Sequence, residues 1–342
     1  MHLIQQTFSL HKITPFPAMD SPHSHHSLRE HEGLLSRYLV TYHPNQVNMR
    51  SLILLTALLF CMITPATSSA QERIWLYPAN TTDIVHAGFD SLAPFMDYFP
   101  ASSKSAGKTT IVICPGGAYA HLAWEKEGTI PASIFNAAGI DAFVLHYRLN
   151  NRKQEGHNYP AQYNDVTTAL QLIRSGKVGK GIDPKKIGVM GFSAGGHLAS
   201  TAATIHKEGN PTAENWHERF SSRPDFAILI YPVISMDTVF GHRYSREMLL
   251  GKTPTNEMVQ QLSTEKRVNK NTPPTWLLHA DNDKSVPPKN SIIFYDALKT
   301  FEIPAAITIF DHGGHGFGTA PYDKVLSQWP WMCIEWLHNN HF

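Results

Sequence analysis

Residues 187–205 hold a serine in the setting that nucleophilic chemistry requires. An apolar run ends in the pentapeptide GFSAG (191–195), and an alanine-rich stretch follows it. In the G-x-S-x-G arrangement a strand turns sharply into a helix and presents the serine hydroxyl at the bend. A side chain at Gly191 or Gly195 would strike the neighbouring strand or helix. We therefore predict that Ser193 is a nucleophile; the alternative is a glycine-rich packing turn.

A serine hydroxyl needs a base, and the base needs a group that orients it. Two later strand-like runs end in residues of these types: 275–280 is followed by DND (281–283), and 305–310 is followed by DHGGHG (311–316). Serine, then aspartate, then histidine is an order in which catalytic triads occur. We expect a triad of this kind, which needs neither a metal nor a cofactor.

Each of these two segments offers a second candidate. Asp283 lies on the loop beyond its strand, where a carboxylate can reach a histidine, whereas Asp281 is suited to bind backbone amides of the turn. His315 is flanked by glycines that let its loop bend over the serine, whereas His312 adjoins the strand. We favour Asp283 as the acid and His315 as the base.

The oxyanion of the reaction needs backbone amides that point at it. Ala194 supplies one, and the segment TTIVICPGGAY (109–119) places a glycine-containing loop after an early strand, so the amides of Gly117 and Ala118 are candidate donors. The alternative is an ordinary Pro-Gly turn. Tyr119 and Trp124 follow this loop and are predicted, from position alone, to contact substrate.

These residues must be positioned by alternating strands and helices. Apolar strand-like runs occur at 74–78, 109–114, 141–147, 186–192, 226–232, 275–280 and 305–310, and helical stretches at 127–138, 161–176, 194–206, 288–301 and 323–339. Alternation of this kind predicts an α/β fold with a mainly parallel sheet and helices on both faces. Residues 234–273 interrupt this alternation of strands and helices, and we expect a lid or substrate-binding insert in this segment.

The first 70 residues do not follow this pattern. Residues 1–48 hold seven of the 20 histidines and little periodic apolar sequence, so we expect a disordered or non-native extension. From Met49 onward Arg50, an apolar stretch and the small residues TPATSSA give the three parts of a signal peptide, 49–70. We expect a secreted or periplasmic mature chain, 71–342, that forms one catalytic domain.

The composition of residues 71–342 excludes several kinds of partner. With 25 basic and 25 acidic residues and no basic run, nucleic acid is not expected to bind. The apolar stretch before residue 71 is shorter than a membrane span, and no span is expected in the mature chain. Cys114 and Cys333 lie in apolar surroundings and are expected to be buried thiols without a disulfide.

Six sequence blocks in this order carry a family resemblance: CPGGAY (114–119), YRL (147–149), IGVMGFSAGGHLA (187–199), SREMLLG (245–251), PPTWLLHADNDKSVPPKNS (273–291) and GGHGFG (313–318). Over residues 107–340 the chain resembles the α/β-hydrolase family of bacterial carbohydrate esterases, related to acetylxylan esterases and the hormone-sensitive-lipase group. The resemblance implies Ser193, Asp283 and His315 as the triad. In relatives the oxyanion segment often ends in glycine where Ala118 stands, which restricts φ here.

The resemblance implies an exported serine esterase that hydrolyses small acyl esters, often acetyl groups, on plant-cell-wall or other carbohydrates. Two alternatives stay open. A serine peptidase of the prolyl-oligopeptidase type would share the chemistry, although 272 residues leave no room for a propeller domain. A non-catalytic, sugar-binding pseudo-hydrolase would share the fold, although every expected triad residue type is present.

Overall fold

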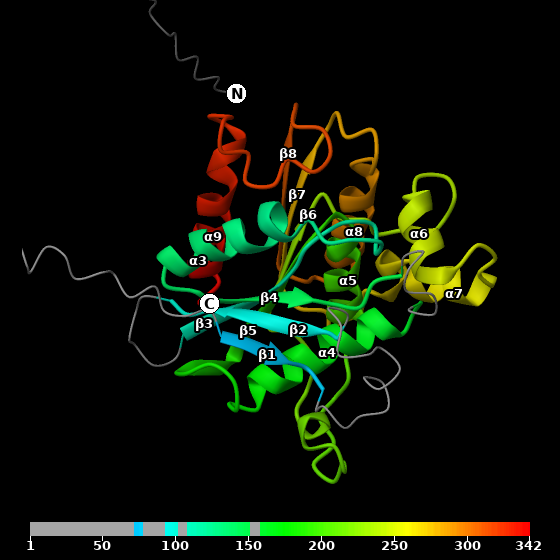
Figure 1. The fold of residues 1–342 in the computed structure, drawn as a ribbon. Helices are drawn as coiled ribbons and strands as arrows, with labels where there is room; N and C mark the ends of the chain where they lie inside the picture. Colours follow the sequence, from blue (N-terminus) through cyan, green and yellow to red (C-terminus); the bar gives the residue numbers. More distant parts are fainter. Residues whose placement is uncertain (1–71, 78–92, 102–107, 151–157) are drawn as a thin grey trace, which may run out of the picture. The chain divides into compact units, whose positions relative to one another are not determined.

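Eight strands form one sheet in the order β1-β2-β4-β3-β5-β6-β7-β8 (Figure 1). The structure, a computed structural model, describes residues 72–77, 93–101, 108–150 and 158–342. From β4 to β8 the neighbouring strands run parallel, while β1 and β2 run antiparallel to their neighbours. The strands are β1 (Glu72–Trp75), β2 (Phe95–Phe99), β3 (Lys108–Cys114), β4 (Asp141–His146), β5 (Ile182–Phe192), β6 (Ala227–Ile230), β7 (Thr275–Ala280) and β8 (Ala305–Phe310).

The central strands are apolar on both faces because helices cover both faces of the sheet. All six residues of β7 and all four of β6 are buried. The register pairs Phe192 with Ile230, and Ile230 with Leu278. The carboxyl ends of β5, β6 and β7 therefore meet at one edge, where ligands of open α/β sheets bind.

Helices divide into two layers, each with its own apolar core. On one face α3 and α9 pack against the sheet through Phe135 and Trp329, and the Trp329 ring stacks on Trp276 of β7 at 6.2 Å. On the other face α4, α5 and α8 bury residues such as Leu198 and Phe294. The helices are α3 (Ile130–Ala137), α4 (Ala161–Arg174), α5 (Ser193–Thr204), α8 (Lys289–Thr300) and α9 (Trp329–Asn339).

Every strand and helix predicted from the sequence is present, with bounds that differ by a few residues. The predicted insert 234–273 contains two short helices, α6 (Arg243–Leu250) and α7 (Asn256–Leu262). A 3₁₀ turn, Thr264–Arg267, packs the insert on α5 and α8.

Strand β2 was not predicted. Its sequence, FMDYF, places a carboxylate in the middle of an apolar segment, which hides the strand pattern. The charge is tolerated because Asp97 lies opposite Arg73 in the antiparallel register and accepts two hydrogen bonds from its guanidinium, at 2.9 and 3.1 Å. Cross-strand charge pairs of this kind stabilise edge strands.

The predictions for the N-terminal segments, for a membrane span and for the cysteines have different outcomes. The extension 1–48 and the signal peptide 49–70 lie outside the described residues. No helix in the described ranges is long and apolar enough to cross a bilayer. Cys114 and Cys333 are buried free thiols, as expected.

Candidate active site

The strand-to-helix turn at Ser193 has the predicted geometry. Strand β5 ends at Phe192, and Ser193 opens α5 with a φ of 52°, in the left-handed region that residues with a Cβ rarely adopt. A Cβ added to Gly191 would lie 2.0 Å from the Gly195 carbonyl oxygen, and one added to Gly195 would lie 2.1 Å from the Cys114 carbonyl oxygen. Both glycines are therefore required by the backbone, and strain at Ser193 is of the kind found at functional sites.

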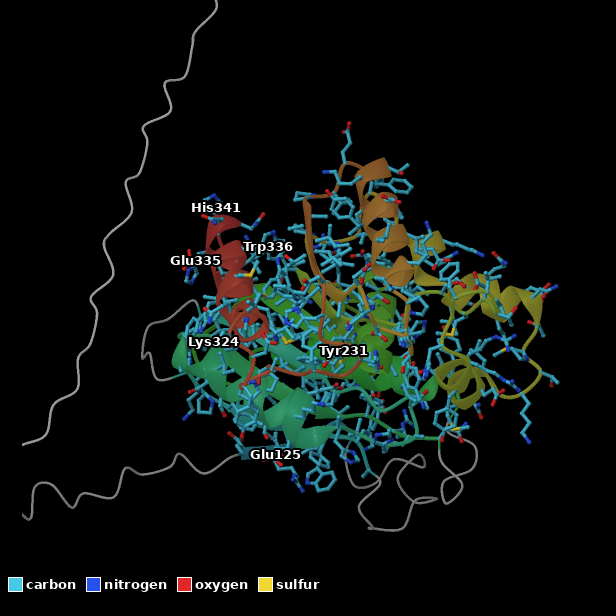
Figure 2. All side chains as sticks on the ribbon, turned by 90° about the horizontal axis from the view of Figure 1, so that it is seen from above. Glu125, Tyr231, Lys324, Glu335, Trp336 and His341 are labelled. Carbon is cyan, nitrogen blue, oxygen red and sulfur yellow. The ribbon has the colours of Figure 1, made fainter. Side chains whose placement is uncertain are left out.

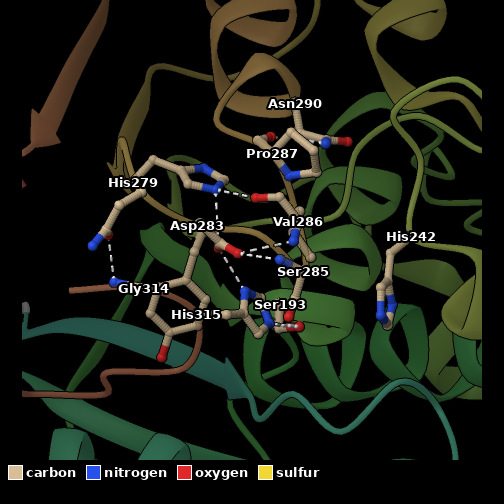
Figure 3. Close-up of polar contacts among 12 residues, drawn as sticks. Ser193, His242, His279, Asp283, Ser285, Val286, Pro287, Asn290, Gly314 and His315 are labelled. Carbon is tan, nitrogen blue, oxygen red and sulfur yellow. Dashed lines mark hydrogen bonds and ion pairs between the residues drawn. The ribbon is translucent and has the colours of Figure 1, made fainter. Parts of the chain in front are cut away.

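The structure brings Ser193, His315 and Asp283 together in one chain of hydrogen bonds (Figure 3). Ser193 Oγ lies 2.8 Å from His315 Nε2, and His315 Nδ1 lies 2.6 Å from Asp283 Oδ2. Because a carboxylate accepts and does not donate, Nδ1 carries the proton and Nε2 is left to accept from the serine hydroxyl. This order of donors is the one a base needs in order to take a proton from Ser193.

The Asp283 carboxylate is held ionised by its surroundings. Its side chain is fully buried, and burial raises its pKa, but hydrogen bonds from His279, His315 and the Val286 amide outweigh burial and lower the pKa below the ordinary value. Oδ1 accepts from the amides of Ser285 and Val286, each at 2.9 Å, which leaves Oδ2 for His315.

The alternative acid, Asp281, has a different setting. It is exposed, and its backbone amide donates to the Phe310 carbonyl at 2.7 Å. The expectation that Asp281 binds the turn amides was wrong, because those amides donate to Asp283.

The two histidines after β8 point to different places. The His315 loop is folded by glycines with positive φ, among them Gly314 and Gly316, and the Gly314 amide donates to Asn282 Oδ1 at 2.7 Å. His312 is 43% exposed in its side chain and bonds Asp311 and Asp323 instead. Only His315 reaches Ser193.

The segment predicted to supply the oxyanion donors is a strained loop. Gly117, Ala118 and Tyr119 have positive φ values of 131°, 55° and 62° in succession. A Cβ added to Gly117 would lie 2.1 Å from the His121 carbonyl oxygen, so no larger residue fits there. Ala118 has a Cβ and lies in the left-handed region that favours glycine, at a cost of roughly 1–2 kcal/mol. Ala194 lies in the first turn of α5, where amides have no partner within the helix.

The two residues predicted to contact substrate are occupied by protein contacts. Tyr119 is fully buried, and its hydroxyl donates to His197 Nδ1 at 2.7 Å. Burial lowers the pKa of His197 to about 4, and its Nε2 donates to the Leu262 carbonyl at 2.7 Å. Tyr119 therefore links residues 115–119, called the oxyanion loop below, to α5 and to the insert. The Trp124 ring packs on Phe95 and His146, each at 5.8 Å between ring centres.

Three buried residues around this site were not recognised in the sequence. His279 donates from Nε2 to the Val286 carbonyl at 2.8 Å and lies 3.3 Å from Asp283 Oδ2. Glu127 and Tyr231 bind each other behind the site. The available signal was their position: Tyr231 directly follows β6, and His279 lies near the carboxyl end of β7. Across the described ranges, no group of three or more histidine, cysteine, aspartate or glutamate residues could hold a metal ion.

Comparison with known proteins places this geometry in a family. The sequence profile of the BD-FAE family matches residues 96–298. The chain is 32% identical to endo-1,4-beta-xylanase B of Butyrivibrio fibrisolvens over 78% of its own length, and 30% identical to the acetylxylan esterase of Xylanibacter ruminicola over 84%. It spans 41% and 55% of the lengths of these two relatives.

Solved structures agree with this result. The acetyl ester-xyloside bifunctional hydrolase of Caldicellulosiruptor lactoaceticus is 36% identical and superimposes with a TM-score of 0.73, over 80% of this chain and 97% of that one. Propionate-bound esterase Est2 of Thermogutta terrifontis shares the fold, with a TM-score of 0.63 at 21% identity over 80% of this chain and 96% of its own. The chain has the α/β-hydrolase fold and belongs to the BD-FAE family.

Proposed function

We propose that this protein is a serine esterase that hydrolyses small acyl esters on carbohydrates without a metal or cofactor. The observation that carries the proposal is the hydrogen-bonded chain from Ser193 through His315 to Asp283, with heavy-atom distances of 2.8 and 2.6 Å. Both distances are within the range that direct proton transfer requires. The ionised state of Asp283 supports its proposed role, because a buried negative charge stabilises the imidazolium that forms during the reaction.

Each residue has one task in the proposed reaction. Ser193 Oγ attacks the acyl carbonyl carbon while His315 Nε2 takes the hydroxyl proton, and that proton then passes to the leaving alcohol oxygen. Water, activated by the same nitrogen, hydrolyses the acyl-enzyme. Amides of Ala194, Gly117 and Ala118 are proposed to hold the tetrahedral oxyanion.

The substrate class is proposed from the relatives. The names of an acetylxylan esterase and an acetyl ester-xyloside hydrolase support an acetyl group on a sugar hydroxyl. The insert 234–273, which carries α6 and α7, is the segment proposed to distinguish the alcohol. A peptidase of the prolyl-oligopeptidase type is not favoured, although one more distant relative is an acylamino-acid-releasing enzyme at 26% identity.

Hydrolysis of p-nitrophenyl acetate and of an aminoacyl anilide separates these possibilities. We expect the wild-type protein to cleave the acetate ester and not the anilide, and Ser193→Ala to lose the ester activity. Anilide cleavage would favour the peptidase, and no cleavage of either would favour a sugar-binding pseudo-hydrolase. Acetate release from acetylated xylan, compared with other acetylated glycans and a feruloylated substrate, then identifies the alcohol and acyl group.

We also propose that the protein is exported. The order of charged, apolar and small residues in 49–70 supports this. N-terminal sequencing of the protein from the secreted or periplasmic fraction should begin at Gln71. Active protein that carries residues 1–48 would contradict two proposals, that translation starts at Met49 and that the protein is exported.

A further inference from the structure

A second buried carboxylate, Glu127, lies directly behind the catalytic serine. It belongs to a single π-turn, Glu125–Thr129, that precedes α3, and it is 4% exposed. A Cβ added to Gly116 would lie 2.5 Å from Glu127 Oε2 and 2.9 Å from Ser193 Cβ, so Gly116 is wedged between the two side chains. Glu127 Oε2 accepts a hydrogen bond from the Gly116 amide at 2.8 Å. The carboxylate therefore anchors the start of the oxyanion loop.

The other oxygen of Glu127 reaches the opposite side of the site through Tyr231. Tyr231 follows the carboxyl end of β6, is fully buried and has a φ of 35° (Figure 2). Its hydroxyl accepts from the Gly318 amide at 3.0 Å, and its proton is directed to Glu127 Oε1 at 2.9 Å. Gly318 closes the loop that carries His315. One buried bridge thus runs from the oxyanion loop to the loop of the base.

The same tyrosine touches the base directly. The Tyr231 ring meets the His315 ring edge to face, with 5.2 Å between centres, and Phe317 packs on Tyr231 at 4.7 Å. Burial, and next the charge of Glu127, raise the pKa of Tyr231 well above its ordinary value, so its hydroxyl remains a donor. The bridge is therefore fixed in direction: both oxygens of Glu127 accept, as an ionised carboxylate does.

The Glu127 carboxylate and the His315 ring are close enough to interact electrostatically. Burial raises the pKa of Glu127, while hydrogen bonds from Tyr231 and Gly116 and the charge of His315 oppose the rise. The titratable groups around this pair are Asp283 on the β7 loop, Lys126 on the π-turn, His242 on the insert, Tyr231 after β6 and Tyr147 after β4. Asp283 is the carboxylate among these groups.

We propose that Glu127 and Tyr231 are positioning residues: their bridge holds the oxyanion loop and the His315 loop in place around Ser193, and the Glu127 charge stabilises the imidazolium of His315. Neither residue touches the reacting atoms, so each acts through the groups that do. This inference rests on the proposed esterase function.

Two variants separate the effect of the bridge on loop position from the effect of the Glu127 charge. Glu127→Gln keeps the shape but can satisfy only one of the two donors, and it removes the charge. Tyr231→Phe keeps the charge and the ring but breaks the bridge. We expect both to lower kcat by about 10- to 100-fold, because small displacements of reacting groups cost this much. KM for p-nitrophenyl acetate should stay within about twofold.

The pH profile of kcat/KM gives a readout that a merely structural role would not move. Loss of a nearby negative charge disfavours the protonated ring, so the acid limb should move to lower pH in Glu127→Gln, by about 0.5. In Tyr231→Phe the charge remains and the acid limb should stay within about 0.2 of the wild-type position.

The chain offers a matched control at the opposite end of the sheet. Asp141, at the start of β4, is a buried carboxylate that accepts from the Tyr98 hydroxyl at 2.9 Å and from the Ala101 amide at 2.6 Å. Asp141→Asn and Tyr98→Phe therefore disturb bonds of the same kinds far from Ser193, and Asp141→Asn also weakens the ion pair of Asp141 with Lys108. We expect them to lower Tm while leaving kcat within about twofold and the acid limb unmoved.

Each result of these measurements either supports the inference or overturns it. Wild-type kcat in both Glu127→Gln and Tyr231→Phe, or an unmoved acid limb in Glu127→Gln, would overturn the inference. If Glu127→Gln does not fold, kcat of Tyr231→Phe decides: a loss supports the bridge, and a wild-type value overturns it. Absence of esterase activity in the wild-type protein would instead contradict the proposed function, so the two failures are distinguishable.

Discussion

Two aspartate–histidine pairs follow strands β7 and β8, and they differ in that His315 bonds the hydroxyl of Ser193 whereas His312 bonds a second carboxylate. His315 binds Asp283 at 2.6 Å, and His312 binds Asp323 at 2.8 Å. The partners and distances are alike. The surroundings differ, because the Asp283 side chain is fully buried while the side chains of His312 and Asp323 are 43% and 34% exposed.

The difference decides which pair can serve as a base. His312 donates from both ring nitrogens, to Asp311 and to Asp323, so neither nitrogen is left to accept a proton. These hydrogen bonds raise the pKa of His312, which favours the protonated ring. Its pairing adds stability at low pH, and this is lost as pH rises through that raised pKa. Asp283, by contrast, stays ionised in a buried site, where its Oδ2 accepts from His315 Nδ1 at 2.6 Å. A pair becomes catalytic through burial, orientation and a nucleophile within reach.

The largest expected effect separates the two histidines. His315→Ala should lower kcat by several orders of magnitude, up to about 10⁶, as removal of a triad member does. His312→Ala should leave kcat within a fewfold, because it breaks only exposed contacts. Steady-state kinetics with p-nitrophenyl acetate measures both. A reversal of the two results would show that the base has been assigned to the wrong histidine.

A smaller loss should separate the two aspartates. Asp283→Asn removes the charge that favours the imidazolium and the correct tautomer, and a loss in kcat of at least about 10² is expected, given about 10⁴ for the analogous change in a serine protease. Asp281→Asn should cost far less, because Asp281 is exposed. Both variants should be compared at saturating substrate. Greater damage from Asp281→Asn would move the acid two residues back.

The pH profile sharpens the same contrast with a more modest change. Wild-type kcat/KM should rise with pH and level off in mild alkali, because a general base must be unprotonated to accept the serine proton. The lowered pKa of Asp283 keeps this carboxylate ionised across that range, so a single acid limb is expected. His312→Ala should retain this limb. Displacement of the limb in that variant would link the exposed pair to catalysis.

The smallest effect concerns the strained oxyanion loop. Ala118→Gly should leave Tm unchanged or slightly raised, because relief of the left-handed φ offsets the added freedom of glycine in the unfolded chain. Ala297→Gly, within α8, is the matched control and should lower stability by about 1 kcal/mol. Equal losses of Tm would indicate that Ala118 is not strained.

The sequence predicts the parts of this molecule that are governed by local pattern. Apolar runs flanked by turns identify the central strands, and the GFSAG turn and the residues after β7 and β8 identify Ser193, Asp283 and His315, which the structure brings together. Their catalytic roles remain predictions. The order of strands at one sheet edge makes such long-range meetings predictable.

Long-range pairing of single polar groups is not predictable in this way. Strand β2 depends on the match of Asp97 with Arg73, and the bridge behind Ser193 joins Glu127 to Tyr231 across 104 residues. Neither leaves a periodic pattern. Tyr119 was expected to face substrate from its position, but its loop turns the side chain inward to His197.

Covalent labelling tests the central claim, that Ser193 is a nucleophile activated by His315, most directly. A phosphorylating reagent specific for activated serines should add one phosphoryl group to the peptide that contains Ser193, as measured by mass spectrometry after proteolysis. The same reaction should be lost in His315→Ala and retained in His312→Ala. Labelling at another residue, or equal labelling of Ser193 in His315→Ala, would contradict the assignment.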